Sequence, residues 1–413
     1  MVRQQVVGPG LARRQVLAGG LLGTFAVTTG ACSRPTGQAS RQSLPAGEDL
    51  VFGACLELTG TGSVAGIAQQ RALKIAQDAL NTDGVTVGNT VRKVRLIVKD
   101  NRSDPGAAAA IAQEFVSAKV AGIIGGGLAG TSTAIAGVAE PQGIPLLSTS
   151  AVETVVRPPA THRFIFKLGP NAGDVAALMI AGLQRETRGG PALTKIAMFA
   201  SANEHGDAGV EAVRRALADD NRKLVATERL PIGAQDYQPQ ASRIVAANPD
   251  AVVIWAVSPI SGLAARAMRS ARYTTRKLLF DAGAASDESL TPENREAMAD
   301  SYVVGPQILS GNPLAVNTPT GAAQRDFFDR YSRAYGGFSG LGVYAADAVN
   351  LLAGAANRAG APTPLRIRNE LEASPFDGLA GAYVFSTANH GGVQASGLAL
   401  FSLQRNGGWL QLV

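Results

Sequence analysis

The sequence predicts an α/β protein built of two parallel β-sheets, each covered by helices on both faces. Short apolar segments rich in valine and isoleucine alternate with longer segments of helical periodicity. This alternation continues from about residue 50 to residue 280, and it is the order expected of parallel strands joined by helices. The roughly 365 residues after position 48 exceed one ordinary domain and suit two.

The first run of alternating elements extends from Leu50 to Leu147. Strands are expected at 50–56, 91–98, 120–124 and 144–147, with helices at 65–81, from 105 onward, and at 131–140. Asp104 and Pro105 mark a helix start, because Asp caps free N–H groups and Pro is tolerated at the first helical position. Ligands of such sheets bind at the carboxyl ends of the strands.

A second run of the same kind begins near Asn171. Helices are expected at 174–186, 207–218, 237–247 and 262–271, and strands at 195–199, 223–230, 251–256 and 277–280. The tail is expected to form helices at 320–335, 344–358 and 364–373, followed by strands near 382–385 and 397–403. The sequence itself does not repeat, but the alternation of strands and helices does. We therefore expect two lobes of similar architecture.

The first 31 residues have the order of a secretory signal peptide. Arg13 and Arg14 precede an uncharged apolar run of about 14 residues, which is too short to cross a bilayer as a permanent helix. The paired arginines resemble a twin-arginine export signal. Gly30-Ala31-Cys32 resembles a lipobox, which predicts a lipid on Cys32. An ordinary cleaved signal in which Cys32 is incidental is the alternative.

Residues 32–48 are polar and rich in Gly, Pro and Ser, which predicts a flexible tether. Together with the signal, this tether predicts an exported lipoprotein at the outer face of the cytoplasmic membrane. The second cysteine, Cys55, lies in an apolar segment and is expected to pack in the core.

Charge and composition argue against nucleic-acid binding. The chain carries +6, of which Arg3, Arg13 and Arg14 contribute three within the signal. The remaining basic residues are scattered, and aromatic residues make up only 5% of the chain.

The sequence also lacks the patterns of an enzyme. The three histidines lie far apart without metal-ligand spacing, and there is no nucleophile-elbow motif. GGGLAG at 125–130 has the spacing of a dinucleotide-binding loop. However, the next strand ends in Ser148-Thr149-Ser150, without the acid that would hold a ribose. We therefore expect no catalysis, no metal and no cofactor.

Four segments form a recognisable series along the chain. They are GACLELTGTGSVAG (53–66), VRLIVKDNRSDPGAAAAIAQEFVSAKVAGIIGG (94–126), GTSTAIAGVAEPQGIPLLSTSA (130–151) and NEHGDAGVEAVRRAL (203–217). In this order and spacing they resemble the leucine/isoleucine/valine-binding family of periplasmic proteins, over about residues 49–413. The resemblance implies the type I periplasmic-binding fold, in which two Rossmann-like lobes are joined by three crossing segments.

The resemblance also implies a division of the chain into lobes. We place the crossing segments near 167–171, 304–307 and 374–378, where Gly or Pro with polar neighbours suits a hinge. The N-terminal lobe then combines 49–169 with 307–375, and the C-terminal lobe combines 170–306 with 376–413. The lobes are expected to close around the ligand, and the protein is expected to be a monomer.

Thr131-Ser132-Thr133 lies where a strand gives way to a helix. Free N–H groups, hydroxyls and the positive end of the helix dipole meet there, which favours a carboxylate or another anion. The alternative is that these residues only cap their helix. The resemblance implies that Thr131 and Ser132 bind the ligand, and that Ser150 and Val152 do so from the next loop. We also assign Asn171, at the first crossing, to the site.

Two residues of the other lobe complete the expected site. The resemblance places His205 where many relatives have a tyrosine. It places Asp281 one residue from Ala282, the closest match to the carboxylate that holds the ammonium of an amino-acid ligand. Val152 cannot supply the threonine hydroxyl of the relatives. Branched-chain amino acids, amides, urea-like solutes and short carboxylic acids therefore all remain open as ligands.

The resemblance implies a binding protein that captures a small solute and delivers it to an ABC permease and its ATPase. The lipid on Cys32 would hold it at the membrane. The alternative is a receptor module that senses a ligand without transporting it, and nothing in the chain separates the two.

Overall fold

The computed structural model describes residues 44–412, except 187–192, 219, 275–276 and 313–316. The expected signal segment, Cys32 and the first part of the tether lie outside the described residues.

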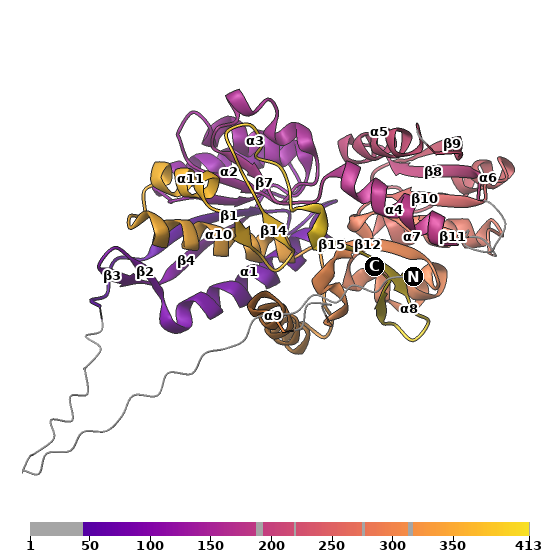
Figure 1. Cartoon of the computed structure of the whole chain (residues 1–413). Coiled ribbons are helices and arrows are strands. Elements are labelled where there is room, and N and C mark those ends of the chain that lie inside the picture. The colour runs from indigo at the N-terminus through magenta and orange to yellow at the C-terminus, as the bar shows by residue number, and fades with distance from the viewer. Residues whose placement is uncertain (1–43, 187–192, 219, 275–276, 313–316, 413) are drawn as a thin grey trace, which may run out of the picture. The chain divides into compact units, whose positions relative to one another are not determined.

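Two β-sheets organise the described chain (Figure 1). The first has the order β4-β1-β5-β6-β7 and is wholly parallel. Its strands are β1 (Leu50–Leu56), β4 (Val94–Asp100), β5 (Ile123–Gly125), β6 (Leu146–Ser148) and β7 (Ile165–Lys167). The predicted α/β class with parallel sheets is confirmed.

The second sheet has the order β16-β15-β12-β11-β10-β8-β9. Five strands are parallel: β8 (Lys195–Ser201), β9 (Lys223–Leu230), β10 (Ala251–Trp255), β11 (Lys277–Phe280) and β12 (Tyr302–Pro306). β15 (Leu398–Leu403) and β16 (Trp409–Gln411) add an antiparallel edge.

The parallel strands of both sheets follow the same spatial order. Counted along the chain, each set of five reads 2-1-3-4-5, with the reversal between β1 and β5 in one sheet and between β8 and β10 in the other. In such sheets the ligand crevice lies at the carboxyl ends of the strands on either side of the reversal.

Helices cover both faces of the first sheet. Ala72 and Leu73 of α1 (Ser63–Asp83) pack in the same core as α10 (Val343–Ala359) and alternate residues of β1. Phe115 of α2 (Pro105–Ser117) and Ile135 of α3 (Ala129–Ala139) pack in a separate core with Cys55. Because successive residues of a strand face opposite sides, the two cores lie on opposite faces of the sheet.

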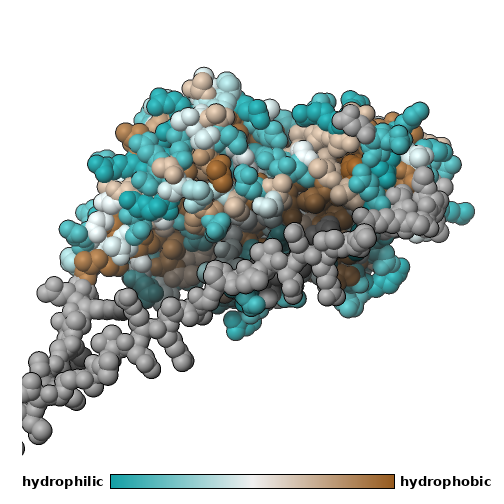
Figure 2. Space-filling view, in the orientation of Figure 1, coloured by the Kyte–Doolittle hydropathy of each residue, from teal (hydrophilic) through white to brown (hydrophobic). Residues whose placement is uncertain are grey.

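Further helices pack in groups. In the second half, α4 (Ala172–Glu186) contacts α5 (Glu204–Ala218), and α7 (Ile260–Ser270) contacts both α6 (Gln238–Ala246) and α8 (Pro292–Met298). α9 (Pro319–Tyr335) contacts α1, and α11 (Pro364–Ala373) contacts α10. No helix within residues 44–412, apart from the gaps above, is long and apolar enough to cross a membrane. Figure 2 shows hydrophilic and hydrophobic residues intermingled on the visible face.

Several elements differ from the sequence-based prediction. The strand expected at 91–98 is divided at Lys93 into β3 (Thr90–Arg92), paired with β2 (Val85–Val87) as a hairpin, and β4. β2, β7, β12, β13 (Phe376–Asp377) and β16 were not predicted from sequence, whereas β14 (Ala382–Tyr383), which pairs with β13, lies within the strand expected near 382–385. α3 and α5 begin two and three residues earlier than expected, which places Thr131 and His205 within first helical turns.

The chain passes between the two sheets after β7, after β12 and before β15. The first and last passages are hydrogen-bonded, since Gly392 N donates to Lys167 O (2.9 Å) and Val393 N donates to Leu168 O (3.2 Å). Gln307 Nε2 donates to Ser396 O (2.7 Å), which ties the second passage to the last. These bonds run beside two of the crossings expected from sequence, near 167–171 and 304–307.

The segment 376–393 packs against the first sheet and its helices. His390 stacks on Phe166 with ring centroids 4.2 Å apart. Leu379 N and Ala380 N both donate to the buried carboxylate of Asp347 on α10. The sequence analysis assigned this segment to the C-terminal lobe, and its contacts lie instead with elements of the first sheet.

Candidate functional site

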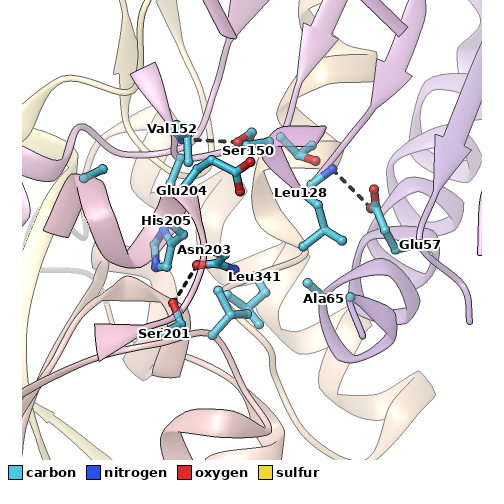
Figure 3. A pocket seen from close by; sticks show the side chains of 18 of the residues that line it. Glu57, Ala65, Leu128, Ser150, Val152, Ser201, Asn203, Glu204, His205 and Leu341 are labelled. Carbon is cyan, nitrogen blue, oxygen red and sulfur yellow. Dashed lines mark hydrogen bonds between the residues drawn. The ribbon is translucent and has the colours of Figure 1, made fainter. Parts of the chain in front are cut away.

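A cavity of about 320 Å³ lies at the carboxyl ends of strands from both sheets. Its lining includes residues at the carboxyl ends of β1, β5, β6, β8, β10 and β11 or within two positions after them, together with residues of α1, α3, α5 and α10. This is the position expected for a ligand in doubly wound sheets, and the volume is that of a small-molecule site. Figure 3 shows ten labelled residues that line the cavity.

Glu57, which directly follows β1, is the most buried acid of the first-sheet wall, with 1% exposure. Its Oε1 accepts hydrogen bonds from Thr131 Oγ1 (2.6 Å) and Asn101 Nδ2 (3.1 Å). Its Oε2 accepts from Gly127 N (3.1 Å), the bond drawn beside Leu128 in Figure 3. All three donors are uncharged groups.

The N-terminus of α3 therefore already has an anion beside it. Thr131 lines the cavity, as the sequence predicted, but its hydroxyl donates to Glu57 rather than pointing freely toward a ligand. The protein's own carboxylate lies where the sequence analysis expected a ligand's. This arrangement satisfies the helix end electrostatically, because negative charge is favoured at the start of a helix.

Two predicted site residues do not line the cavity. Ser132 is fully buried and its Oγ lies 2.6 Å from Ser148 Oγ. Asn171 donates from Nδ2 to Asp174 Oδ2 (3.1 Å) and lies beside Gly392. Ser132 thus packs beneath the cavity wall, and Asn171 belongs to the first passage between the sheets.

Ser150 and Val152 do line the cavity. The Ser150 hydroxyl accepts from Val152 N (3.2 Å), as Figure 3 shows, so it closes a local turn. Val152 contributes an apolar side chain.

His205 and Asp281 form the polar centre of the second-sheet wall. His205 Nε2 lies 2.8 Å from Asp281 Oδ2. Asp281 is 1% exposed and also accepts from Ala256 N (3.0 Å) and Gly283 N (3.1 Å). Asp281 therefore faces inward, and it is paired with the imidazole.

Four buried polar atoms of the lining have no hydrogen-bond partner among the residues that the structure describes. They are Gln69 Oε1, Thr149 Oγ1, Trp255 Nε1 and Tyr344 OH. Buried polar groups are normally hydrogen-bonded, so these atoms mark where a polar ligand would bind. The amide oxygen accepts, the indole N–H donates and the two hydroxyls can do either.

The sequence analysis missed these four residues and Glu57. The sequence could have indicated Glu57 and Trp255 as site residues, because each lies at the carboxyl end of a predicted strand, where ligands of such sheets bind. Nothing in the sequence indicated Gln69 or Tyr344, since each occupies one position within a long helix and the helices are distant in sequence.

The lining is acidic. It contains Glu57, Glu204 and Asp281, no lysine and no arginine, and His205 is its one basic side chain within the described chain. No cluster of three or more His, Cys, Asp or Glu residues placed to hold a metal occurs in the described ranges.

The fold and the cavity define a class of protein: an α/β protein that binds a small molecule at the carboxyl ends of two parallel sheets. Residues 50–407 match the family model described as periplasmic binding protein. The chain therefore belongs to the periplasmic binding protein family, in the leucine/isoleucine/valine-binding-like type I group that the sequence resembles.

Solved structures agree with this fold. An extracellular ligand-binding receptor from Rhodopseudomonas palustris HaA2 is 22% identical, with a TM-score of 0.77, 88% of this chain covered and 99% of that chain. The branched-chain amino acid transporter substrate binding protein LivJ from Streptococcus pneumoniae, in complex with isoleucine, is 20% identical, with a TM-score of 0.72, 88% of this chain covered and 99% of that chain.

A third structure is the solute binding protein of an ABC transporter from Rhodopseudomonas palustris BisB5, in complex with 3,4-dihydroxy benzoic acid. It is 16% identical, with a TM-score of 0.74, 89% of this chain covered and 96% of that chain. No curated protein matches the chain. The family is one of binding proteins, which confirms the prediction of a ligand-binding protein rather than an enzyme.

Proposed function

We propose that this protein is an extracytoplasmic substrate-binding protein that captures a small solute in the cavity and delivers it to an ABC permease and its ATPase. The observation that carries the proposal is the set of four unpartnered buried polar atoms lining one cavity from both sheets. Two neighbours of the same fold are described as transporter binding proteins. Solutes of the amino acid, amide, amine and small carboxylate classes fit the cavity volume.

We infer that the two sheets belong to two lobes that close on the solute. The lining of each wall is incomplete alone, because Gln69 and Thr149 lie on the first-sheet side and Trp255 on the second. A ligand favours the closed form only through contacts made across both walls. The hydrogen bonds among 167–168, 307 and 392–396 would guide that hinge.

A solute panel tests capture directly. Ligand at 100 times its Kd should stabilise the protein by about 2.7 kcal/mol and raise its melting temperature. Small-angle scattering should show compaction with the same solute. Ala65→Trp, which places a large side chain into the cavity from α1, should abolish the shift. A solute whose effect survives Ala65→Trp would contradict the assignment of this cavity.

The proposed anchor requires its own experiment. In the native host, Cys32→Ser should release the protein from the membrane fraction and remove the mass of a lipid. Retention of both lipid mass and membrane association in that variant would contradict the proposal.

A further inference from the structure

The strongest unassigned feature is a cluster of polar groups around Gly127, at the start of the turn before α3. A Cβ atom on Gly127 would lie 3.0 Å from Glu57 Oε2, 3.4 Å from Gln69 Nε2 and 3.6 Å from Thr149 Oγ1. Glu57 directly follows β1, Gln69 lies on α1 and Thr149 directly follows β6, so the three side chains are distant in sequence and converge over one glycine. The lack of a side chain at 127 keeps the point between them open to the cavity.

The cluster has unused hydrogen-bonding capacity beside the cavity. Gln69 and Thr149 are 3% and 7% exposed, and Gln69 Oε1 and Thr149 Oγ1 have no partner among the described residues. A carboxylate offers about four acceptor positions, and Glu57 uses two on Oε1 and one on Oε2. The remaining acceptor is therefore on Oε2, the oxygen nearest the point above Gly127.

The charge of Glu57 is also uncompensated within the cavity. Its three donors are neutral, and the described lining holds no lysine or arginine. Buried charges in proteins are ordinarily paired with an opposite charge. Asp281 has the imidazole of His205 beside it (2.8 Å), whereas Glu57 forms no ion pair with a basic side chain of the described residues.

We propose that Glu57, Gln69 and Thr149 form a subsite for a protonated amine, so that the solute is a small organic ammonium rather than an anion. This inference rests on the proposed function and specifies its ligand class. An ammonium has three donors and no acceptor, which matches the free position on Glu57 Oε2 and the Thr149 hydroxyl, and also the Gln69 amide once it is turned so that Oε1 rather than Nε2 faces the point above Gly127. A ligand carboxylate in the same place would face Glu57 across a buried, low-dielectric space and be repelled.

The remainder of the cavity fits an apolar body attached to the amine. Leu128, Val152, Trp255, Ile260 and Leu341 line it. Leu128 and Leu341 are among the labelled side chains that line the cavity in Figure 3. We therefore choose a branched aliphatic skeleton for the test probes.

Three probes share that skeleton and differ only in the head group: 3-methylbutylamine, 3-methylbutan-1-ol and 3-methylbutanoate. Trp255 lines the cavity, and Trp409 is the second tryptophan of the chain, so Trp409→Phe leaves one fluorescent reporter of binding. Titration calorimetry on the same protein provides an independent Kd. We expect the amine to bind at least about tenfold more tightly than the carboxylate, with the alcohol between them.

Substitutions at the subsite sharpen the test. Glu57→Gln keeps the size and removes the charge, and should weaken the amine about tenfold or more while changing the alcohol less than about threefold. Gly127→Ala places a methyl group between the three side chains and should weaken the amine by a similar factor.

Glu140→Gln is the matched control. Glu140 is the C-terminal cap of α3, about 16 Å from the cavity end of this 11-residue helix, and its carboxylate accepts from Arg163 N and Phe164 N. The amine should bind this variant as it binds the wild type. If Glu57→Gln fails to fold, Gly127→Ala, which retains Glu57, still decides the question.

Tighter binding of the carboxylate than of the amine would overturn the inference, as would amine binding that ignores both subsite variants. If 3-methylbutanoate binds more tightly and Ala65→Trp abolishes its binding, the proposed capture of a solute in the cavity still stands. If neither the probes nor the wider solute panel binds, the inference and the proposed function fall together.

Discussion

The two walls of the cavity use the same sheet topology but present their carboxylates differently. Glu57 in the first wall receives three neutral donors, whereas Asp281 in the second receives two backbone N–H groups and an imidazole. Both side chains are 1% exposed. The shared topology places polar residues at the carboxyl ends of strands, and the neighbouring side chains then decide whether a carboxylate is already paired or available to a ligand.

The largest effect is expected from removing Asp281, which is paired with His205 in the second-sheet wall. Asp281→Ala should lower the free energy of unfolding by about 3–5 kcal/mol, because His205 and two buried N–H groups lose their common acceptor. Urea denaturation of wild type and variant measures the difference. Asp281→Asn, which keeps an oxygen acceptor, should lose less. A loss below about 1 kcal/mol for the alanine variant would contradict the structural role of this pair.

A third buried carboxylate, that of Asp347, lies outside the cavity lining. Its titration is therefore expected to change the stability of the protein rather than ligand binding. Burial raises the pKa of Asp347 to about 7, although hydrogen bonds from Ala380 N, Leu379 N and Tyr383 oppose the shift. Between pH 3.8, the ordinary pKa of an aspartate carboxyl, and about pH 7, the folded state holds a proton that the unfolded state has lost. The stability that this proton contributes is therefore lost as pH rises through that window.

Asp347→Asn cannot titrate and should flatten this dependence. The unfolding free energy of the wild type should fall, relative to the variant, by about 2–4 kcal/mol between pH 4 and pH 7.5. Denaturation curves for both proteins at the two pH values give this double difference, in which other titrating groups cancel. Equal slopes for the two proteins would show that Asp347 does not titrate in this range.

Thr131→Val tests how the unpaired carboxylate is held. The isosteric change removes the 2.6 Å hydrogen bond to Glu57 Oε1 without opening space. Loss of this donor loosens the position of the Glu57 carboxylate, so 3-methylbutylamine should bind about 2- to 10-fold more weakly. Calorimetry measures the change. Unaltered affinity would mean that Asn101 and Gly127 alone position Glu57.

The smallest effect is expected at Ser132, beneath the same wall. Its hydroxyl meets Ser148 and does not line the cavity, so Ser132→Ala should change affinity less than about twofold. It should lower the unfolding free energy by about 1 kcal/mol through the lost hydrogen bond. A tenfold loss of affinity would restore Ser132 to the ligand contacts that the sequence resemblance implied.

The sequence predicted the elements that depend on local pattern. The strand at 50–56 has the predicted bounds, and Asp104 caps α2 by accepting from Ala107 N (2.7 Å). Short strands such as β7 were missed, because three residues carry too little periodicity to be distinguished from a buried loop.

The predicted site residues that line the cavity lie near the end of a strand or the start of a helix. Thr131, Ser150, Val152, His205 and Asp281 all line the cavity, as their positions in the α/β pattern suggested. The side-chain directions of Ser132 and Asn171 were beyond such reasoning, since a shift of one residue at a helix start turns a side chain by about 100°.

The sequence by itself determined the α/β class, the order of the elements and the membership of this chain in a family of binding proteins, because alternating periodicity and helix capping are local properties. Only the tertiary structure decided which polar groups meet. Glu57, Gln69 and Thr149 are brought together over Gly127 by the packing of α1 and the parallel alignment of β1, β5 and β6. The character of the cavity, acidic and without lysine or arginine in its described lining, follows from that convergence, because hydrogen bonding and charge act through distance in space rather than along the chain.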